Sequence, residues 1–303
     1  MSASAPRAGR LAATVGLWGL VLVGWLPAHL PPAVGLAVGR RIGDALWWLL
    51  PGRRRLTLEN IRLSLGRELT PGEVARLARR SFQHLGMNLI EACCYFLRPT
   101  DVMLSRVHLE GVEHLRSAAG QGRGILVLTA HYGNWELLAA AHGLTGLPLS
   151  IVIRPLDHPV LDELAARFRQ RSGAELIFKH QAVREVLQAL RRGRMVGILL
   201  DQNATRAEGV FVPFFGVPAS TSKGLAVLAL RTSAPVVPVF IRREPDGRHC
   251  LEAGPALEPP ADGDVSAYTA AFNQVIEAAI RRAPEQWLWM HARWRTRPRE
   301  AVS

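Results

Sequence analysis

Short, uniformly apolar segments alternate with helical patterns through most of the chain, and this alternation restricts the possible folds more than any other feature. Four segments typical of buried strands lie at 124–129, 149–153, 195–200 and 236–241. Helical patterns follow near 134–145, 158–171, 181–193, 221–233 and 264–282. Alternating strands and helices favour a mostly parallel sheet flanked by helices, since parallel strands need long crossover connections. The sequence therefore predicts an α/β fold.

A long helix is predicted at 71–97, ahead of the first strand. Thr70 is a suitable N-cap, Pro71 occupies the first helical position, and Glu73 stands where a capping box needs it. The Pro-, Gly- and Asp-rich stretch 254–264 is predicted to be a surface loop. Because the chain shows no internal repeat and no low-complexity linker, residues 51–303 are predicted to form one domain.

The N-terminal region is apolar and is predicted to anchor the protein to a membrane. Asp, Glu, Lys and Arg are absent between Leu11 and Gly39. The part from Leu11 to Leu30 is barely long enough to span a bilayer, which needs about 20 apolar residues. Arginines flank it, and the larger cluster lies downstream, which favours a cytoplasmic body after an anchor region at 1–50. A buried pair of helices in a soluble protein is the alternative, and a cleaved signal peptide fits poorly.

The chain is basic, with a formal net charge of +12 that comes almost entirely from arginine. Such a surface attracts nucleic acid, anionic lipid or an acidic carrier protein. No nucleic-acid-binding module is recognisable, so binding to nucleic acid is not expected. Cys93, Cys94 and Cys250 form no CxxC pair, and the histidines show no metal-binding spacing such as HExxH. Neither a disulfide framework nor a metal site is therefore predicted.

Three of the predicted strands end at a polar residue. The strands at 124–129, 149–153 and 195–200 lead to His131, Arg154 and Asp201. Because the carboxyl ends of parallel strands share one edge of the sheet, where ligands bind, these side chains are predicted to converge.

His131 is followed five residues later by Glu136, in the segment HYGNWE. If His131 ends the strand and Gly133 turns the chain, Glu136 falls in the first turn of the next helix and can reach back to the imidazole. A carboxylate on Nδ1–H fixes the tautomer and leaves Nε2 free as a base. The chain lacks the G-x-S-x-G signature of serine hydrolases, so the base is predicted to activate a substrate hydroxyl directly.

HYGNWE resembles the H-x4-D/E motif of the lipid A late acyltransferase family, within the lysophospholipid acyltransferase superfamily. The resemblance covers almost the whole chain, through the segments RRRLTLENIRLSLG (53–66), IVIRPLDHPVLDEL (151–164), ILLDQNATRAEGVFVPFFGVPASTSKG (198–224) and PEQWLWMHARWRTRP (284–298). It implies a glycerol-phosphate-acyltransferase-like fold, an N-terminal membrane helix and an enzyme on the cytoplasmic face of the inner membrane. The reaction it implies moves a fatty acyl chain to a glycolipid hydroxyl from acyl carrier protein or coenzyme A, which are donor substrates rather than cofactors.

Roles for single residues follow. His131 is the predicted general base and Glu136 its orienting carboxylate. Arg154 holds a phosphate or stabilises developing negative charge, unless it forms a buried salt bridge. Asp201 holds Arg154 or a sugar hydroxyl, or forms a turn. Asn134 donates near the oxyanion or caps the helix.

For the later segments, structural and functional interpretations remain open. Phe211, Phe214 and Phe215 are candidates to line an acyl channel, or belong to a core strand and turn. Ser220 or Thr221 is expected to cap the following helix, and Lys223 contributes to an anion site or is solvated. Near the C-terminus, Trp287, Trp289 and Trp294 either contact the membrane interface or pack internally.

Two other functions compete with acylation of a lipid A precursor. One is acylation of a different acceptor, such as a lysophospholipid, a mannosylated lipid or an ornithine lipid. The other is a membrane-tethered lipid-binding protein without turnover. An intact pair of His131 and Glu136 argues against the second, because binding alone needs no tuned base.

Overall fold

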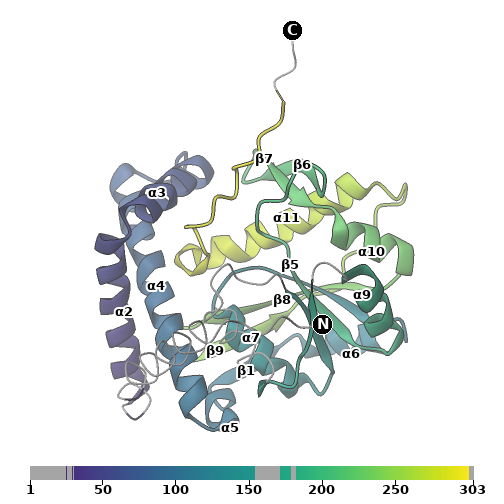
Figure 1. Cartoon of the computed structure of the whole chain (residues 1–303), viewed down its shortest axis with the longest axis horizontal. Coiled ribbons are helices and arrows are strands. Elements are labelled where there is room, and N and C mark those ends of the chain that lie inside the picture. Colours follow the sequence, from purple (N-terminus) through teal and green to yellow (C-terminus); the bar gives the residue numbers. More distant parts are fainter. Residues whose placement is uncertain (1–24, 26–28, 30, 154–170, 179–181, 300–303) are drawn as a thin grey trace, which may run out of the picture.

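A computed structural model describes Trp25, His29 and residues 31–153, 171–178 and 182–299. In these residues a seven-stranded, mostly parallel sheet is flanked by helices (Figure 1), which confirms the predicted α/β fold. Its strands are β1 (Val107–Glu110), β2 (Ile125–Thr129), β3 (Leu149–Ile153), β4 (Glu175–Phe178), β5 (Met195–Leu199), β8 (Val236–Arg243) and β9 (His249–Ala253).

The strands are arranged in the order β1-β9-β8-β2-β5-β3-β4. From β8 to β4 all neighbours are parallel. At the other edge, β9 runs antiparallel to β8 and pairs in parallel with β1. The four predicted strands are β2, β3, β5 and β8, so the sequence correctly identified the centre of the sheet and one strand beside it.

Most predicted helices are also present. The described helices are α2 (Pro32–Leu49), α3 (Pro51–Leu65), α4 (Pro71–Leu97), α5 (Thr100–Leu104), α6 (Val112–Ala119), α7 (Trp135–Ala141), α9 (Ala182–Arg191), α10 (Gly224–Thr232) and α11 (Val265–Arg282), with short 3-10 turns η1 (His142–Thr145) and η3 (Pro284–Gln286). The helix predicted near 158–171 lies almost entirely outside the described residues. Thr70 caps α4 in a reciprocal capping box with Glu73, as predicted.

Alternate residues of β2 enter two different cores, because successive side chains of a strand point to opposite faces. Leu126 and Leu128 belong to the larger core, together with apolar residues of α9, α10 and α11. Ile125 and Val127 belong to the second core, with α6 and α7. The central strand is therefore buried on both faces, which explains its continuous apolar sequence.

Helix α2 packs alongside α4, beside the sheet (Figure 1), through glycines that allow close backbone approach. A Cβ atom added to Gly43 would lie 2.3 Å from the carbonyl oxygen of Phe82. The face of α2 turned away from α4 and the C-terminal end of the helix carry exposed apolar side chains, at Val34, Val38, Trp48, Leu49 and Leu50. Within the described residues, no helix is both long enough and apolar enough to cross a membrane. Most of the predicted anchor, including nearly all of Leu11–Leu30, lies outside those residues.

The segment around Phe211 forms a separate antiparallel hairpin, β6 (Gly209–Phe214) and β7 (Val217–Ser222). Phe215 and Gly216 both have positive φ angles, 52° and 72°, as the tight hairpin turn requires. The hairpin packs on α11. Its second strand leads the chain directly into α10.

Candidate active site

The sheet register places His131 and Asp201 beside each other at its carboxyl edge. Thr129 of β2 pairs with Leu199 of β5, and each polar residue follows two positions later. The pairing continues for one more hydrogen bond, from the Leu200 amide to the Thr129 carbonyl. The predicted convergence of these two residues is therefore confirmed. Arg154 lies outside the described residues.

Asp201 makes three hydrogen bonds that hold it against His131. Its Oδ1 accepts from Nδ1 of the His131 ring at 2.8 Å. Its Oδ2 accepts from the backbone amide of His131 at 3.0 Å and from Nε1 of Trp287 at 2.8 Å. Burial favours the neutral acid, but the charge and hydrogen bonds of His131, with the bond from Trp287, outweigh it and lower the pKa of Asp201. The carboxylate is therefore ionised at neutral pH.

An ionised acceptor at Nδ1 determines the tautomer of His131. Because Asp201 accepts this hydrogen bond, the ring proton of neutral His131 lies on Nδ1 and Nε2 carries a lone pair. Gln202 is exposed, and its side-chain nitrogen lies 3.2 Å from Nε2 of His131, to which it can donate a hydrogen bond. The His131 side chain is 20% exposed and stacks edge-on with Trp135. In the structure Nε2 of the His131 ring faces the amide of Gln202, which is exposed.

The contact predicted between Glu136 and Nδ1 is wrong, because Asp201 occupies that position. Glu136 does lie in the first turn of α7, as expected, and it is partly exposed. The carboxylate at the imidazole therefore comes from Asp201, at the end of the adjacent strand, and not from Glu136, which is close in sequence. The register that brings Asp201 there cannot be read from the spacing of HYGNWE.

Asn134 caps α7, as one of the two interpretations predicted. Its Oδ1 accepts from the Leu137 amide at 3.1 Å, and its buried Nδ2 donates to Glu91 at 2.6 Å. Asn88 donates to the carbonyl of Gly133 at 2.8 Å. Glu91 and Asn88 both lie on α4, so this helix holds the turn that follows His131.

Glu91 belongs to a buried ionic network that the sequence analysis missed. It forms an ion pair with Arg243 of β8 and a hydrogen bond with His249 of β9. Burial favours its neutral acid, but the charges of Arg243 and His249 outweigh that effect and lower the pKa of Glu91. Arg243 also donates to Asn88 at 2.6 Å. The network ties α4 and the end of β8 to the turn that carries His131.

The remaining predicted site residues have mixed outcomes. Phe214 and Phe215 are buried against Trp287, Trp289 and Trp294, which is the packing alternative for all five residues. Phe211 is 37% exposed and lies beneath the guanidinium of Arg206. Lys223 is exposed and is itself the N-cap position of α10, so neither Ser220 nor Thr221 caps that helix.

Ser220 and Thr221 instead contact a fully buried arginine. Arg293 donates to the Ser220 carbonyl at 2.7 Å and to Oγ1 of Thr221 at 2.5 Å, and lies over the ring of Phe214. Burial lowers its pKa to about 10. This guanidinium joins the C-terminal segment to the hairpin.

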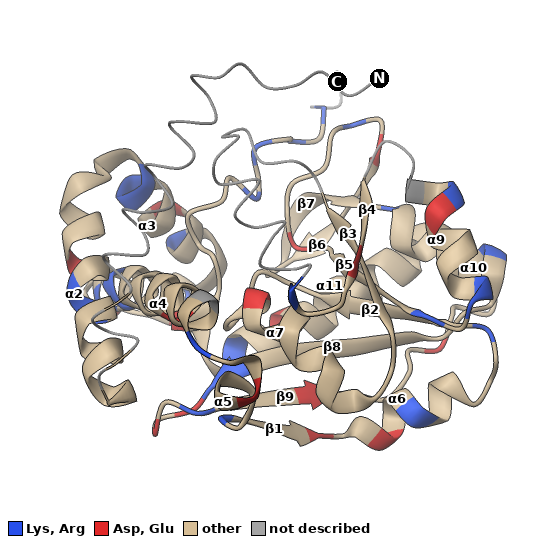
Figure 2. Ribbon diagram, turned by 60° about the horizontal axis from the view of Figure 1, so that its bottom comes forward, with Lys and Arg blue, Asp and Glu red and all other residues tan. Residues whose placement is uncertain are grey.

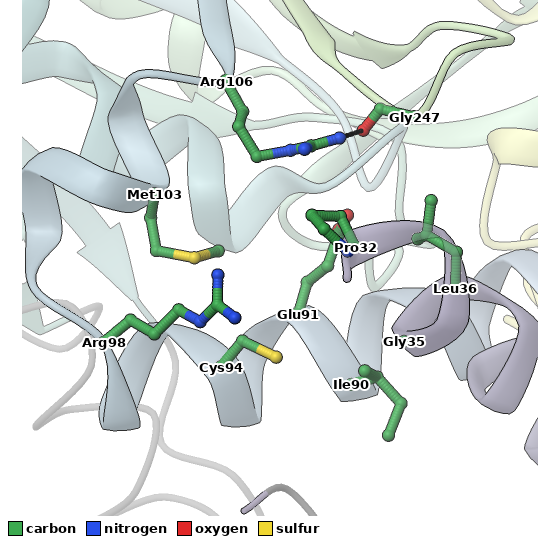
Figure 3. Close-up of a pocket in the computed structure, with 10 residues that line it drawn as sticks. All are labelled: Pro32, Gly35, Leu36, Ile90, Glu91, Cys94, Arg98, Met103, Arg106 and Gly247. Atoms are coloured by element: carbon green, nitrogen blue, oxygen red, sulfur yellow. Dashed lines mark hydrogen bonds between the residues drawn. The ribbon is translucent and has the colours of Figure 1, made fainter. Parts of the chain in front are cut away.

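A small cavity of about 50 Å³ lies between α2, α4 and α5 (Figure 3). Glu91 forms part of its wall, together with Arg98 and Arg106, and the remaining lining is mostly apolar. On one wall of the cavity Arg106 donates to the carbonyl of Gly247 at 3.2 Å. Neither His131 nor Asp201 lines it, so the cavity adjoins the ionic network rather than the reactive imidazole.

Sequence comparison identifies relatives of this chain. The sequence profile of the bacterial lipid A biosynthesis acyltransferases matches residues 7–296. The chain is 31% identical over 277 residues to the lipid A biosynthesis lauroyltransferase of Escherichia coli K12, covering 90% of this chain and 89% of that enzyme. The palmitoleoyltransferase of the same strain is also 31% identical, with the same coverage. A phosphatidylinositol mannoside acyltransferase of Mycolicibacterium smegmatis is 30% identical over 187 residues, 60% of each chain.

Proposed function

The chain belongs to the family of bacterial lipid A biosynthesis acyltransferases, and from this premise we propose that it transfers a fatty acyl chain from a thioester to a hydroxyl of a lipid A precursor. One observation supports this most directly. Nδ1–H of His131 is held by Asp201, which leaves the lone pair on Nε2 opposite the exposed Gln202 amide. Such an imidazole can take a proton from an alcohol at neutral pH.

The proposed reaction proceeds without an acyl-enzyme intermediate. Nε2 of His131 accepts the proton of the acceptor hydroxyl as its oxygen forms a bond to the thioester carbonyl carbon. The tetrahedral intermediate then breaks its carbon–sulfur bond, and the imidazolium returns the proton to the departing thiolate. During the reaction the amide of Gln202 gives up its position at Nε2 to the acceptor hydroxyl.

Asp201 is the positioning residue in this scheme. Its negative charge orients the ring and stabilises the imidazolium that forms in the reaction. Glu136 lies in the first turn of α7 and remains a proposed second carboxylate of the site, acting at the same edge. Asn134, with Nδ2 donating to Glu91, holds the turn. Arg154 is retained as a proposed phosphate-binding residue on sequence grounds alone.

A membrane location fits the surface of the N-terminal helices. The exposed apolar side chains near the end of α2, Trp48 and Leu49, are followed by Arg53, Arg54 and Arg55 in α3 (Figure 2). Apolar and basic groups together favour the interface of an anionic membrane. The proposed location is the cytoplasmic face of the inner membrane, with acyl carrier protein or coenzyme A as donor. The full chain can be mixed with anionic vesicles and the two fractions separated. If as much protein stays in the soluble fraction as is recovered with the vesicles, the proposed membrane location is contradicted.

A different acceptor is the second candidate, because a phosphatidylinositol mannoside acyltransferase is also similar to this chain. The two are separated by the coverage of the alignments. That relative aligns with 60% of the chain, whereas the lauroyltransferase aligns with 90%. The lipid A precursor is therefore the acceptor that we propose.

The decisive experiment is an acyl-transfer assay with purified full-length protein, acyl carrier protein loaded with labelled fatty acid, and a lipid A precursor. We expect transfer by the wild type and a loss of about 10²–10⁴-fold in His131→Ala, whose base is missing. Melting curves establish that the variant is folded. Full activity of a folded His131→Ala would refute the mechanism, and transfer to a mannosylated lipid alone would refute the acceptor.

A further inference from the structure

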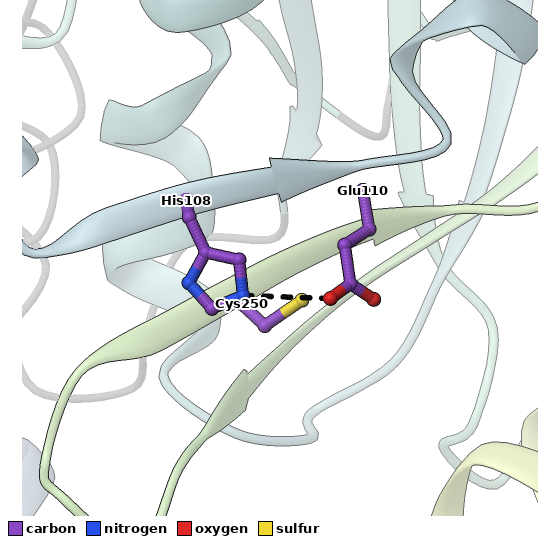
Figure 4. Close-up of side chains that lie close together, drawn as sticks. All are labelled: His108, Glu110 and Cys250. Atoms are coloured by element: carbon purple, nitrogen blue, oxygen red, sulfur yellow. Dashed lines mark ion pairs between the residues drawn. The ribbon is translucent and has the colours of Figure 1, made fainter.

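Three side chains with the chemistry of metal ligands meet at the edge of the sheet opposite β4. His108 and Glu110 stand two residues apart on β1 and share one face of that strand. Cys250 of β9 is paired in register with His108 (Figure 4). One ligand atom from each of the three lies within 4.8 Å of the other two. In the described part of the chain, no second group of three or more His, Cys, Asp or Glu residues meets this criterion.

The distances are close to those of a zinc site. Zinc binds nitrogen and oxygen at about 2.0–2.1 Å and sulfur at about 2.3 Å with tetrahedral geometry, so neighbouring nitrogen and oxygen ligands lie about 3.3 Å apart. Nε2 of His108 lies 3.5 Å from Oε1 of Glu110. The Cys250 side chain is buried and fixed, whereas the other two are 41% and 55% exposed and free to adjust. Small rotations of the exposed pair are enough to close the site on the sulfur.

A second carboxylate lies where a metal-binding histidine usually has one. Oε2 of Glu244 is 3.7 Å from Nδ1 of His108, on the far side of the ring from Glu110. Metal-ligating imidazoles almost always donate their other N–H to such a group, which orients the ring and makes it more basic. At 3.7 Å Glu244 is not hydrogen-bonded to Nδ1, but a small rotation of its partly exposed carboxylate brings it within reach, and Nε2 of His108 already faces Glu110.

We propose that His108, Glu110 and Cys250 bind a divalent cation of the zinc type, with Glu244 orienting His108 and water completing the coordination. Binding releases the thiol proton of Cys250 to solvent, since thiolate is the ligand. Besides its ion pair with His108, Glu110 accepts a hydrogen bond from the Cys250 thiol, so the cation would replace this thiol proton. The cation links β1, an edge strand, to β9. The residue spacing does not reveal this site, because β1 and β9 meet only through the fold.

Cobalt(II) is the probe, since it takes tetrahedral thiolate sites and reports a cobalt–sulfur bond by a charge-transfer absorption band. We expect metal-free full-length protein to gain this band with one equivalent of cobalt, and zinc to remove it. Cys250→Ser should lose the band, whereas Cys94→Ser, a matched change at another cysteine, should keep it. His131→Ala should also keep it, which separates this site from the proposed active site.

Two exposed or partly exposed carboxylates complete the test without disturbing the core. Glu110→Gln removes a ligand and should weaken zinc binding strongly, and Glu244→Gln should weaken it by about 10–100-fold. Glu113→Gln on α6 is the matched control and should bind like the wild type. A wild type without the cobalt–sulfur band, a band that persists in Cys250→Ser, or equal zinc affinity in Glu110→Gln and Glu113→Gln would each overturn the proposal.

Discussion

At the scale of single residues, the two oxygens of Asp201 have different partners, and this difference defines the state of His131. Oδ2 accepts from two N–H groups, those of the His131 backbone and the Trp287 indole. Oδ1 faces Nδ1 of the His131 ring alone. Neither backbone nor indole N–H can act as an acceptor, so an oxygen is required at the Oδ2 position.

Asp201→Asn should therefore disable the enzyme without removing the histidine. The amide oxygen will take the Oδ2 position, and the NH₂ group will face Nδ1 and donate to it. His131 must then carry its proton on Nε2, and its basic lone pair no longer faces the acceptor. We expect kcat to fall by about 10²–10⁴-fold in the acyl-transfer assay, close to the effect of losing the base.

Glu136→Gln is the informative comparison, because Glu136 does not hold Nδ1 in the structure. It should lower kcat less than Asp201→Asn does. Trp287→Phe, which removes one of the two donors to Oδ2, should also have the smaller effect. A kcat of Asp201→Asn equal to or above that of Glu136→Gln would show that Asp201 does not set the tautomer.

The sequence predicted part of this site because strand ends are visible in it. Polar residues directly after apolar strands identified His131 and Asp201, and the parallel sheet brought them together. The choice of Glu136 as partner failed, since proximity in sequence competes with a register that spacing does not reveal. Glu91, Arg243 and His249 were missed for the same reason, because each lies on a different element and no local pattern links them.

At the scale of elements, burial on both faces made strands predictable. β2, β5 and the first part of β8 are continuous apolar segments, and all were predicted. The edge strand β1 reads VHLE, and β9 reads HCLEA; each mixes polar with apolar residues over four or five positions. Such short mixed segments give no clear period, so both strands were missed. The prolines of the β6–β7 hairpin made its strands unclear, so a strand and turn there remained one alternative to an acyl channel.

The close packing of α2 against α4 depends on glycines, which have no Cβ atom. A Cβ on Gly43 would lie 2.3 Å from the Phe82 carbonyl oxygen, and one on Gly86 would lie 2.1 Å from that of Gly39. Because both obstacles are backbone, only a shift of one helix can relieve them. The two helices are therefore held at a separation that these glycines permit.

Gly43→Ala should destabilise the protein by about 1–3 kcal/mol, the usual cost of overpacking. Gly52→Ala is the matched control, since nothing lies within 4 Å of its added Cβ in α3. Alanine is the better helix former, so this control should gain about 0.5–1 kcal/mol. Urea unfolding of both variants measures the difference. If Gly43→Ala is as stable as Gly52→Ala, the close contact of the two helices is wrong.

At the scale of the whole molecule, the C-terminal segment after α11 connects the site to the layers around it. Its Trp287 holds Asp201, and its Gln286 exchanges hydrogen bonds with the backbone of Arg243. Its His291 accepts from the Asn203 amide at 3.1 Å through Nε2, just after the residues that follow β5. Asn60 of α3 donates to the carbonyls of Trp289 and His291. Folding of this segment therefore completes the active site and the attachment of α3 together.

This arrangement makes stability sensitive to acid through His291. Burial lowers its pKa from 6.5 to about 4, and the positive charges of His131 and Arg293 contribute in the same direction against the opposing effect of Asp201. Burial also lowers the pKa of His84 well below its ordinary value. Between pH 6.5 and pH 4 the unfolded chain binds protons at these residues that the folded protein does not. Stability therefore rises with pH across this window and is lost as the pH falls through it.

His291→Gln should remove much of this dependence, because glutamine retains an acceptor for the Asn203 amide but does not titrate. For His291 the difference between 6.5 and about 4 corresponds to up to about 3 kcal/mol. Urea unfolding at several pH values measures the free energy of unfolding of both proteins. Between pH 6.5 and pH 4 we expect that of the wild type to fall by up to about 3 kcal/mol more than that of His291→Gln. His114→Gln, on α6, should follow the wild type. Carboxylates such as Asp201, whose pKa is lowered by folding, add a further loss at still lower pH that both proteins share. Parallel curves for His291→Gln and wild type across the window would show that His291 is not held neutral by its surroundings.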